Sequence, residues 1–183
     1  MTIGVRHDDL RRRNRMMVIA AVRRAGQPSR TEIASTTGLS HSTISTISSD
    51  LIEEGILAEA KNGETGALKR GRPQVALGLN PKAATVVAVV LSLNSLSAAL
   101  IDYSGRAIAH DISRPPTLTM EAADLVEAVA ASVRRLLARA EPGHGPVLRM
   151  TLGIQGITDS EARKLMWSPI TPHSDIAFAD ALE

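Results

Sequence analysis

The stretch QPSRTEIASTTGLSHSTISTISSDLIEEG, residues 27–55, decides how the front half of this chain folds. Its first part has the spacing of a capping box, in which Ser29 and Glu32 each accept a hydrogen bond from the other's backbone N–H. A short helix is therefore expected to begin at Arg30. Gly38 is expected to end it, because glycine adopts the left-handed conformation that closes many helices without steric cost. Only a tight turn fits between this helix and the next.

A second helix follows the turn, and Ser40 is the side chain that caps it. This helix covers residues 41–54 and stops at Gly55. Its apolar residues recur at helical spacing, at Ile44, Ile47, Leu51 and Ile52. A longer helix, from about Asp9 to Ala25, precedes both. Helices joined through a Gly-containing turn, the last of them polar along its outer face, describe a helix-turn-helix.

The outer face of helix 41–54 consists mostly of short hydroxyl side chains. Such side chains suit contacts with phosphates and base edges, because they let a helix sit deep in the major groove. The alternative is a merely soluble surface, but Ser and Thr are poor helix formers, and a solvated face more usually carries Glu, Lys and Arg. DNA reading is therefore the favoured interpretation. The candidate contacts in and before this helix are Arg30, Ser40, His41, Ser42, Thr43, Ser45 and Thr46.

Behind this helix the pattern changes to two short strands, ILAEAK and QVALGL, joined by NGETGALKRGRP at residues 62–73. A hairpin directly after a helix-turn-helix is a wing, whose tip lies beside the DNA. The sequence RGRP looks like the core of an AT-hook, whose arginines lie in a narrow A·T-rich minor groove. A plain solvated loop is the alternative, and the context favours groove insertion by residues 69–73. The candidate contacts on the loop are Lys69, Arg70, Gly71 and Arg72.

The totals exclude several classes of protein. Of the 183 residues, 44% are hydrophobic and 22% charged, as in soluble globular proteins. The absence of cysteine excludes disulfides and thiolate metal sites. No apolar run reaches the length of a membrane span and no secretory signal opens the chain, so a cytoplasmic location is expected. Residues 1–80 hold 12 Lys and Arg against 8 Asp and Glu, while residues 81–183 hold 9 against 11, which hints at an anionic partner for the front half.

These stretches resemble the ROK transcriptional regulators (repressors, open reading frames and kinases). Residues 10–57 are similar to their winged-helix segment, and GRP stands where their wing returns. Farther along, TVVAVVLSLNSLSAALIDYSGRAIAHDI, EAADLVEAVAASVRRLLARA and VLRMTLGIQGITD are similar to the opening of their actin-like sugar-kinase fold. The resemblance implies an α+β chain: a winged helix-turn-helix domain over residues 1–80, then a partial actin-like (ribonuclease-H-like) α/β domain over residues 81–183.

The resemblance also implies a function, namely a DNA-binding repressor of sugar-responsive genes that binds an A·T-rich operator as a homodimer. Two departures from the family matter. ROK kinases hold ATP phosphates with an Asp-x-Gly-Gly-Thr loop, and LSLNSLSA stands in its place here, so neither enzyme activity nor a cofactor is expected. Family members are also about twice as long, and their sugar-contacting, catalytic and zinc-binding residues lie in the half that is missing. No catalytic or metal-binding residue is therefore assigned, and a sugar or sugar-phosphate effector is expected only if that half is present.

Some alternatives stay open. A truncated chain could bind DNA without any ligand, or coat A·T-rich DNA as an architectural protein, whereas a sugar kinase is opposed by both departures. Arg11, Arg12 and Arg13 are either phosphate contacts or a merely solvated basic face. The apolar run from Val86 to Leu91 is typical of a strand covered on both faces. Without the missing half, residues 82–183 are expected to dimerise, to expose an apolar patch or to be marginally stable.

Overall fold

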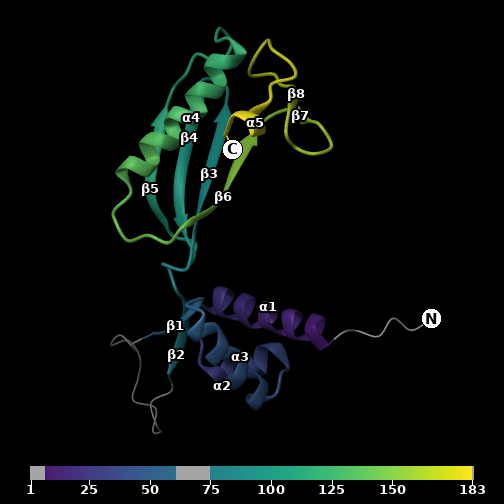
Figure 1. Ribbon diagram of the computed structural model, residues 1–183, viewed down its shortest axis with the longest axis vertical. Coiled ribbons are helices and arrows are strands. Elements are labelled where there is room, and N and C mark those ends of the chain that lie inside the picture. The colour runs from purple at the N-terminus through teal and green to yellow at the C-terminus, as the bar shows by residue number, and fades with distance from the viewer. Residues whose placement is uncertain (1–6, 61–74, 183) are drawn as a thin grey trace, which may run out of the picture. The chain divides into compact units, whose positions relative to one another are not determined.

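The computed structural model describes residues 7–60 and 75–182 (Figure 1). The chain divides into two compact units, Met1–Ala83 and Ala84–Glu183. The first unit contains three helices and a hairpin, and the second contains a sheet with one long helix on it. No helix in the described part of the chain is both long and apolar enough to cross a membrane.

The first unit is a helix-turn-helix followed by a two-stranded hairpin. Its elements are α1 (His7–Ala25), α2 (Arg30–Thr37), α3 (His41–Glu53), β1 (Leu57–Ala60) and β2 (Ala76–Leu79). One side of each helix is buried, and Val22, Ile33 and Leu51 are at most 1% exposed. The strands close over the helices with Leu57 and Leu77, which are at most 2% exposed. Burial of these aliphatic side chains stabilises the unit by roughly 1.5–3 kcal/mol each, so a core without aromatic residues suffices here.

The second unit is built on a four-stranded sheet with the order β5-β4-β3-β6 (Figure 1). Its strands are β3 (Thr85–Ser92), β4 (Ser95–Asp102), β5 (Ala107–Ser113) and β6 (Val147–Ile154). The first three form an antiparallel meander, and β6 runs parallel to β3 after the chain crosses the sheet as α4 (Ala122–Arg139). The short strands β7 (Ile157–Thr158) and β8 (Leu165–Trp167) and the helix α5 (Phe178–Leu182) follow.

Only one face of this sheet is covered. Along β3, Val87, Val89 and Leu91 are about 1% exposed and belong to the core that includes Leu125 and Leu136 of α4. The side chains between them point to the opposite face, where Val86 is 40% and Val90 is 54% exposed. Within the described residues of this unit, the apolar run is therefore covered on one face only. Val86 and Val90 form an exposed apolar patch on the other face, which is one of the three expected outcomes.

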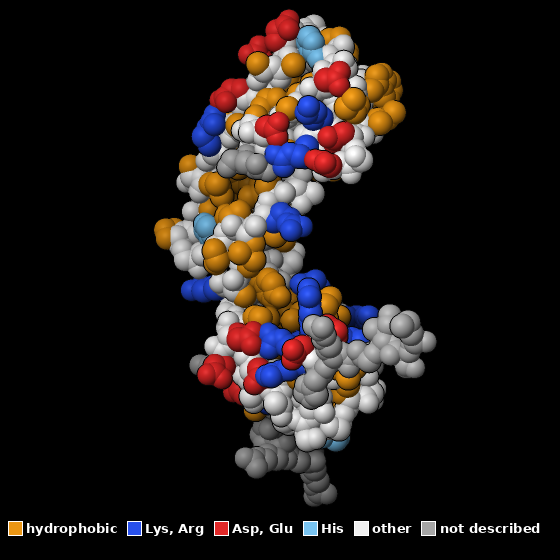
Figure 2. All heavy atoms as spheres, turned by 45° about the vertical axis from the view of Figure 1, so that its right-hand side comes forward, with side chains coloured by type: hydrophobic (Ala, Val, Ile, Leu, Met, Phe, Trp, Pro, Cys, Tyr) orange, Lys and Arg blue, Asp and Glu red, His pale blue; other side chains and the backbone are white. Residues whose placement is uncertain are grey.

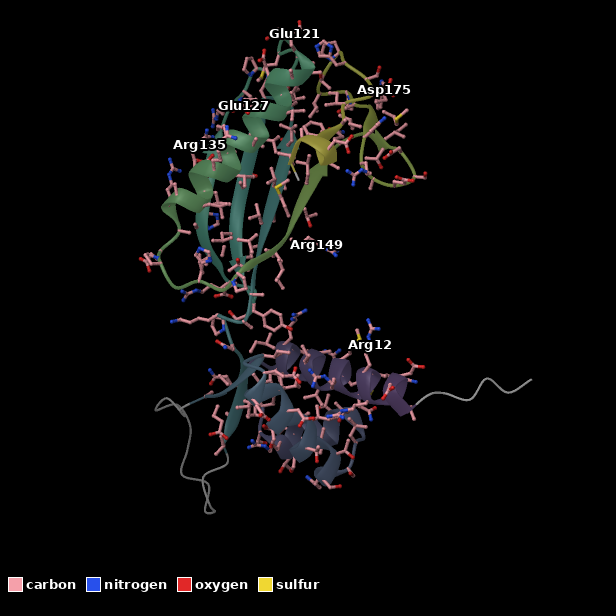
Figure 3. The ribbon with its side chains drawn as sticks, viewed as in Figure 1. Arg12, Glu121, Glu127, Arg135, Arg149 and Asp175 are labelled. Atoms are coloured by element: carbon pink, nitrogen blue, oxygen red, sulfur yellow. The ribbon has the colours of Figure 1, made fainter. Side chains whose placement is uncertain are left out.

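A buried carboxylate ties α4 to the outer strand β5. Asp111 is 2% exposed, and it accepts hydrogen bonds from Ser132 at 2.8 Å, Arg135 at 2.7 Å and Arg139 at 2.9 Å. The hydrogen bond from Arg135, labelled on α4 in Figure 3, lowers the pKa of Asp111 more than its burial raises it. Asp111 therefore stays ionised inside the fold and fixes the position of α4 along the sheet.

Candidate nucleic-acid interface

Caps at both ends of α2 and at the start of α3 define the helix-turn-helix. Ser29 Oγ accepts from the backbone N of Glu32 at 3.3 Å and Glu32 Oε2 accepts from the backbone N of Ser29 at 2.7 Å, which confirms the capping box. Gly38 ends α2 with a φ of 72°, as predicted. Ser40 Oγ then accepts from the backbone N of Thr43 at 3.2 Å and caps α3. These caps determine the residue at which α3 begins, and therefore which side chains it turns outward.

The helix α3 has a buried side and an exposed side. Ile44, Ile47 and Leu51 are at most 5% exposed and hold the helix against the unit. The predicted DNA contacts Ser40, His41, Ser42, Ser45 and Thr46 are exposed together with Ser49, and Thr43 is half-buried. The first turn of α3 carries no acidic residue. Its N-terminal half therefore offers hydroxyl groups and the positive end of the helix dipole to an anionic partner.

Some of these hydroxyl groups already have partners within the helix. Ser40 Oγ lies 2.9 Å from Ser42 Oγ and 2.8 Å from Thr43 Oγ1, and Thr46 Oγ1 donates to the Ser42 carbonyl at 3.1 Å. Within the described residues, His41, Ser45 and Ser49 form no side-chain hydrogen bond. These three side chains of the face therefore have the most freedom to bind another molecule.

Two ion pairs join α1 to the C-terminal half of α3. Arg11 Nη2 lies 2.8 Å from Asp50 Oδ2, and Arg15 makes a two-pronged contact with the Glu54 carboxylate, with one bond of 2.8 Å. The hydrogen bond between Arg15 and Glu54 raises the pKa of Arg15 and lowers the pKa of Glu54. The sequence left Arg11 as either a phosphate contact or part of a solvated basic face, and neither interpretation included these pairs. No local spacing signals them, because they join residues 39 positions apart.

The other arginines of the unit differ in their surroundings. Arg30 Nη2 lies 3.5 Å from Glu59 Oε1 on β1, so its side chain bridges α2 to the hairpin. Arg12 and Arg13 are largely exposed on α1, and Figure 3 shows Arg12 pointing away from α2 and α3. A phosphate contact by Arg30 would therefore compete with Glu59, whereas Arg12 would need no rearrangement of α3.

The base of the predicted wing is present. β1 and β2 pair antiparallel from Leu57 opposite Leu79 to Ala60 opposite Ala76, directly after α3. A Cβ added at Gly78 would come no closer than 3.9 Å to another atom, the Gly26 carbonyl oxygen, so packing does not demand glycine in β2. The predicted contacts Lys69, Arg70, Gly71 and Arg72 lie outside the described residues, so insertion of the wing stays a prediction.

In the second unit, LSLNSLSA forms the closed turn between β3 and β4. The backbone N of Asn94 donates to Thr117 Oγ1 and the backbone N of Thr117 donates to Asn94 Oδ1, both at 3.1 Å. An N–H that a phosphate loop would offer to ATP is therefore used within the fold. Among the described residues, no group of His, Asp and Glu side chains is arranged to hold a metal ion.

Comparison with known proteins agrees with this architecture. No protein-family model matches the chain. A "Putative xylose repressor" of Caldicellulosiruptor sp. (strain Rt8B.4) is 20% identical to it over 177 residues, which are 97% of this chain and 43% of that protein. A solved ROK family transcriptional regulator, described as a homolog of the E. coli MLC protein, matches 94% of this chain and 43% of its own, with a TM-score of 0.61 and 20% identity. The chain has the fold of the ROK regulators.

The ROK fold confirms the predicted α+β class, with a helix-turn-helix ahead of part of an actin-like sheet. The chain spans about two fifths of the length of the relatives that it matches, 43% in each case. A ROK family glucokinase from Streptomyces griseus, solved with glucose and AMPPNP, matches 54% of this chain and 29% of its own, with a TM-score of 0.46 and 20% identity. That likeness is too weak to support an argument about enzyme activity.

Proposed function

We propose that this chain is a DNA-binding transcriptional regulator. The observation that carries the proposal is the exposed hydroxyl face of α3, held outward by the Ser40 cap and by a buried aliphatic side. A helix of this kind fits the major groove, where its N-terminal residues reach base edges. His41, Ser42 and Ser45 are the side chains that we assign to base reading, while Ser40, Thr43 and Thr46 contact phosphates.

Further contacts with the DNA come from the wing and from α2. Arg70 and Arg72, on either side of Gly71, occupy an adjacent A·T-rich minor groove, with Lys69 at its entrance. Arg30 breaks its ion pair with Glu59 and contacts a phosphate instead. The protein binds as a homodimer, so its operator consists of two symmetric half-sites. The residues 1–80 act as the DNA-binding domain, and residues 81–183 as the first part of the actin-like domain.

We further propose that the regulated genes respond to sugars. This rests on the name of a relative, a xylose repressor, and on the shared fold. A sugar or sugar-phosphate effector belongs to this proposal only for a chain that carries the second half of the relatives. The closed turn at Asn94 favours a regulator over a kinase, because it leaves no glycine loop for phosphates.

Fluorescence anisotropy of the chain with A·T-rich and G·C-rich duplexes, at low and moderate salt, tests the proposal. We expect binding that weakens steeply with salt and that favours the A·T-rich duplex. Ser45→Glu should weaken binding by roughly tenfold or more, since it puts a carboxylate in the groove. Ser35→Glu is the matched control, because Ser35 is also an exposed serine within a helix of the same unit but lies on α2.

The double substitution Arg70→Ala/Arg72→Ala separates the two roles of the wing. Loss of the A·T preference with retained binding supports a minor-groove finger, whereas uniform weakening on both duplexes identifies a phosphate clamp. Equal effects of Ser45→Glu and Ser35→Glu would contradict a reading role for α3. No binding to either duplex at low salt would contradict DNA binding by this chain altogether.

A further inference from the structure

The charge of α3 is unexpected in a helix that reads DNA. From His41 to Glu54 the chain holds three acidic residues, Asp50, Glu53 and Glu54, and no Lys or Arg. The DNA-binding face of such a domain usually carries Lys and Arg, which attract phosphates. All three acids lie in the C-terminal half of α3 or at its cap, beyond the side chains that we assign to DNA. Their negative charge opposes the approach of DNA unless neighbouring cations balance it.

Asp50 is the acid nearest in sequence to the proposed contacts. It lies four residues after Thr46, which we assign to a phosphate, and Cβ atoms at this spacing on a helix are about 5–6 Å apart. That separation is shorter than the Debye length, which is about 8 Å at physiological ionic strength, so salt screens the two groups incompletely. An unbalanced carboxylate at Asp50 would therefore weaken the phosphate contact of Thr46.

Two arginines of α1 balance acids of α3. Arg11 Nη2 lies 2.8 Å from Asp50 Oδ2, and Arg15 binds the Glu54 carboxylate. Arg11 and Arg15 are about one turn apart on α1, as are Asp50 and Glu54 at the end of α3, and they pair in the same order. Two pairs one turn apart fix both the rotation and the slide of α3 against α1. Figure 2 shows Lys and Arg side chains among Asp and Glu side chains on the surface of the first unit.

We propose that Arg11 and Arg15 are positioning residues for DNA binding, which act through α3 and do not contact phosphates themselves. The proposal rests on the proposed function of α3. Arg11 cancels the charge of Asp50 beside the contact of Thr46, and Arg15 holds the end of α3 through Glu54. If Arg11 left Asp50 for a phosphate, the Asp50 carboxylate would be unbalanced beside the same DNA. The ion pairs therefore favour positioning over contact.

Second substitutions on α3 separate the two roles. In anisotropy titrations with the duplex that the unmodified chain binds, Arg11→Gln should lower the affinity about fivefold or more, because it leaves a carboxylate near phosphates. Arg11→Gln/Asp50→Asn should restore the affinity to within about twofold, since no unbalanced carboxylate remains. Arg11→Gln/Glu53→Gln is the matched control with the same net charge. Glu53 is exposed and forms no ion pair with another described residue, so the affinity should stay low.

The salt dependence provides a second readout. Arg11→Gln/Asp50→Asn has the net charge of the unmodified chain, so the slope of log affinity against log salt should not change. Loss of a phosphate contact would instead reduce that slope by about 0.9. Arg15→Gln and Arg15→Gln/Glu54→Gln repeat the comparison for the second ion pair, and circular dichroism establishes that each variant is folded.

The outcomes distinguish this inference from the proposed function. If the unmodified chain binds DNA, the positioning role alone is overturned by unchanged affinity in Arg11→Gln and Arg15→Gln. It is also overturned if Asp50→Asn fails to restore binding to Arg11→Gln, if Glu53→Gln restores it equally well, or if the first double variant has a reduced salt slope. If the unmodified chain binds no duplex, the proposed function fails, and the positioning role fails with it.

Discussion

At the scale of single residues, two buried serines in similar settings differ in one respect. Ser48 on α3 and Ser132 on α4 are both fully buried in helices. Ser132 Oγ donates to Asp111 at 2.8 Å, whereas Ser48 Oγ has no hydrogen-bond partner among the described residues. A buried hydroxyl without a partner opposes folding, while one that bonds to a carboxylate stabilises it.

Alanine substitutions at these two positions should therefore act in opposite directions. Ser48→Ala should leave the free energy of unfolding unchanged or raise it by up to about 1 kcal/mol, because the desolvation cost of the hydroxyl disappears. Ser132→Ala should lower it by about 1–2 kcal/mol. Urea unfolding followed by circular dichroism measures both changes. A loss of stability in Ser48→Ala as large as that in Ser132→Ala would contradict this account.

The buried Asp111 should make the second unit sensitive to acid. Its pKa in the folded protein is lowered, first by the hydrogen bond from Arg135, so the folded state favours the ionised form. The stability that it contributes is present above its unfolded pKa of about 3.9 and is lost as the pH falls through its folded pKa. Unfolding by urea, followed by the fluorescence of Trp167 between pH 3 and pH 7, should show this loss.

A substitution on β5 beneath α4 and a control on the exposed side of α4 test the assignment to Asp111. Asp111→Asn should flatten the acid dependence and cost about 1–3 kcal/mol at pH 7, because charge-assisted hydrogen bonds are lost inside the fold. Glu127→Gln is the control, since Glu127 and its partner Arg134 are both about two-thirds exposed on α4. An exposed pair contributes at most about 1 kcal/mol, so the acid dependence should remain.

At the scale of elements, one glycine controls the approach of β7 to β8. Gly156 has a φ of 156°, and an added Cβ would collide with the Trp167 carbonyl oxygen and lie 2.9 Å from Leu165 Cδ1. Gly156→Ala should therefore cost more than about 2 kcal/mol or displace β8 from β7. Gly153→Ala, three residues earlier, should change stability by less than about 1 kcal/mol, because its nearest neighbour is 3.7 Å away. Thermal unfolding followed by Trp167 fluorescence compares the two; equal effects would contradict the steric argument.

The elements also show where sequence patterns were sufficient. The capping box at Ser29, the glycine at 38 and the cap at Ser40 are local, so the bounds of α2 and α3 could be predicted within a residue or two. The role of Arg11 could not, because its pairing with Asp50 joins residues 39 positions apart. Local hydrogen bonds are encoded by spacing, whereas contacts between helices depend on how the helices pack.

At the scale of the whole molecule, the proposed homodimer predicts a dependence on the number of half-sites. A duplex with two half-sites should bind more tightly than a duplex with one, because the second contact becomes intramolecular. Anisotropy titrations with both duplexes measure the effect, and equal affinities would contradict binding as a dimer.

The sequence by itself determined the helix-turn-helix and the hairpin after it, because each rests on local caps, turns and periodicity. The α+β class followed from the resemblance to the ROK regulators. It also located the exposed hydroxyl face of α3, since one side of that helix is aliphatic. Only the tertiary structure decided that the run from Val86 to Leu91 is covered on one face. A strand's pattern shows how apolar it is, whereas the elements that cover it are distant in sequence.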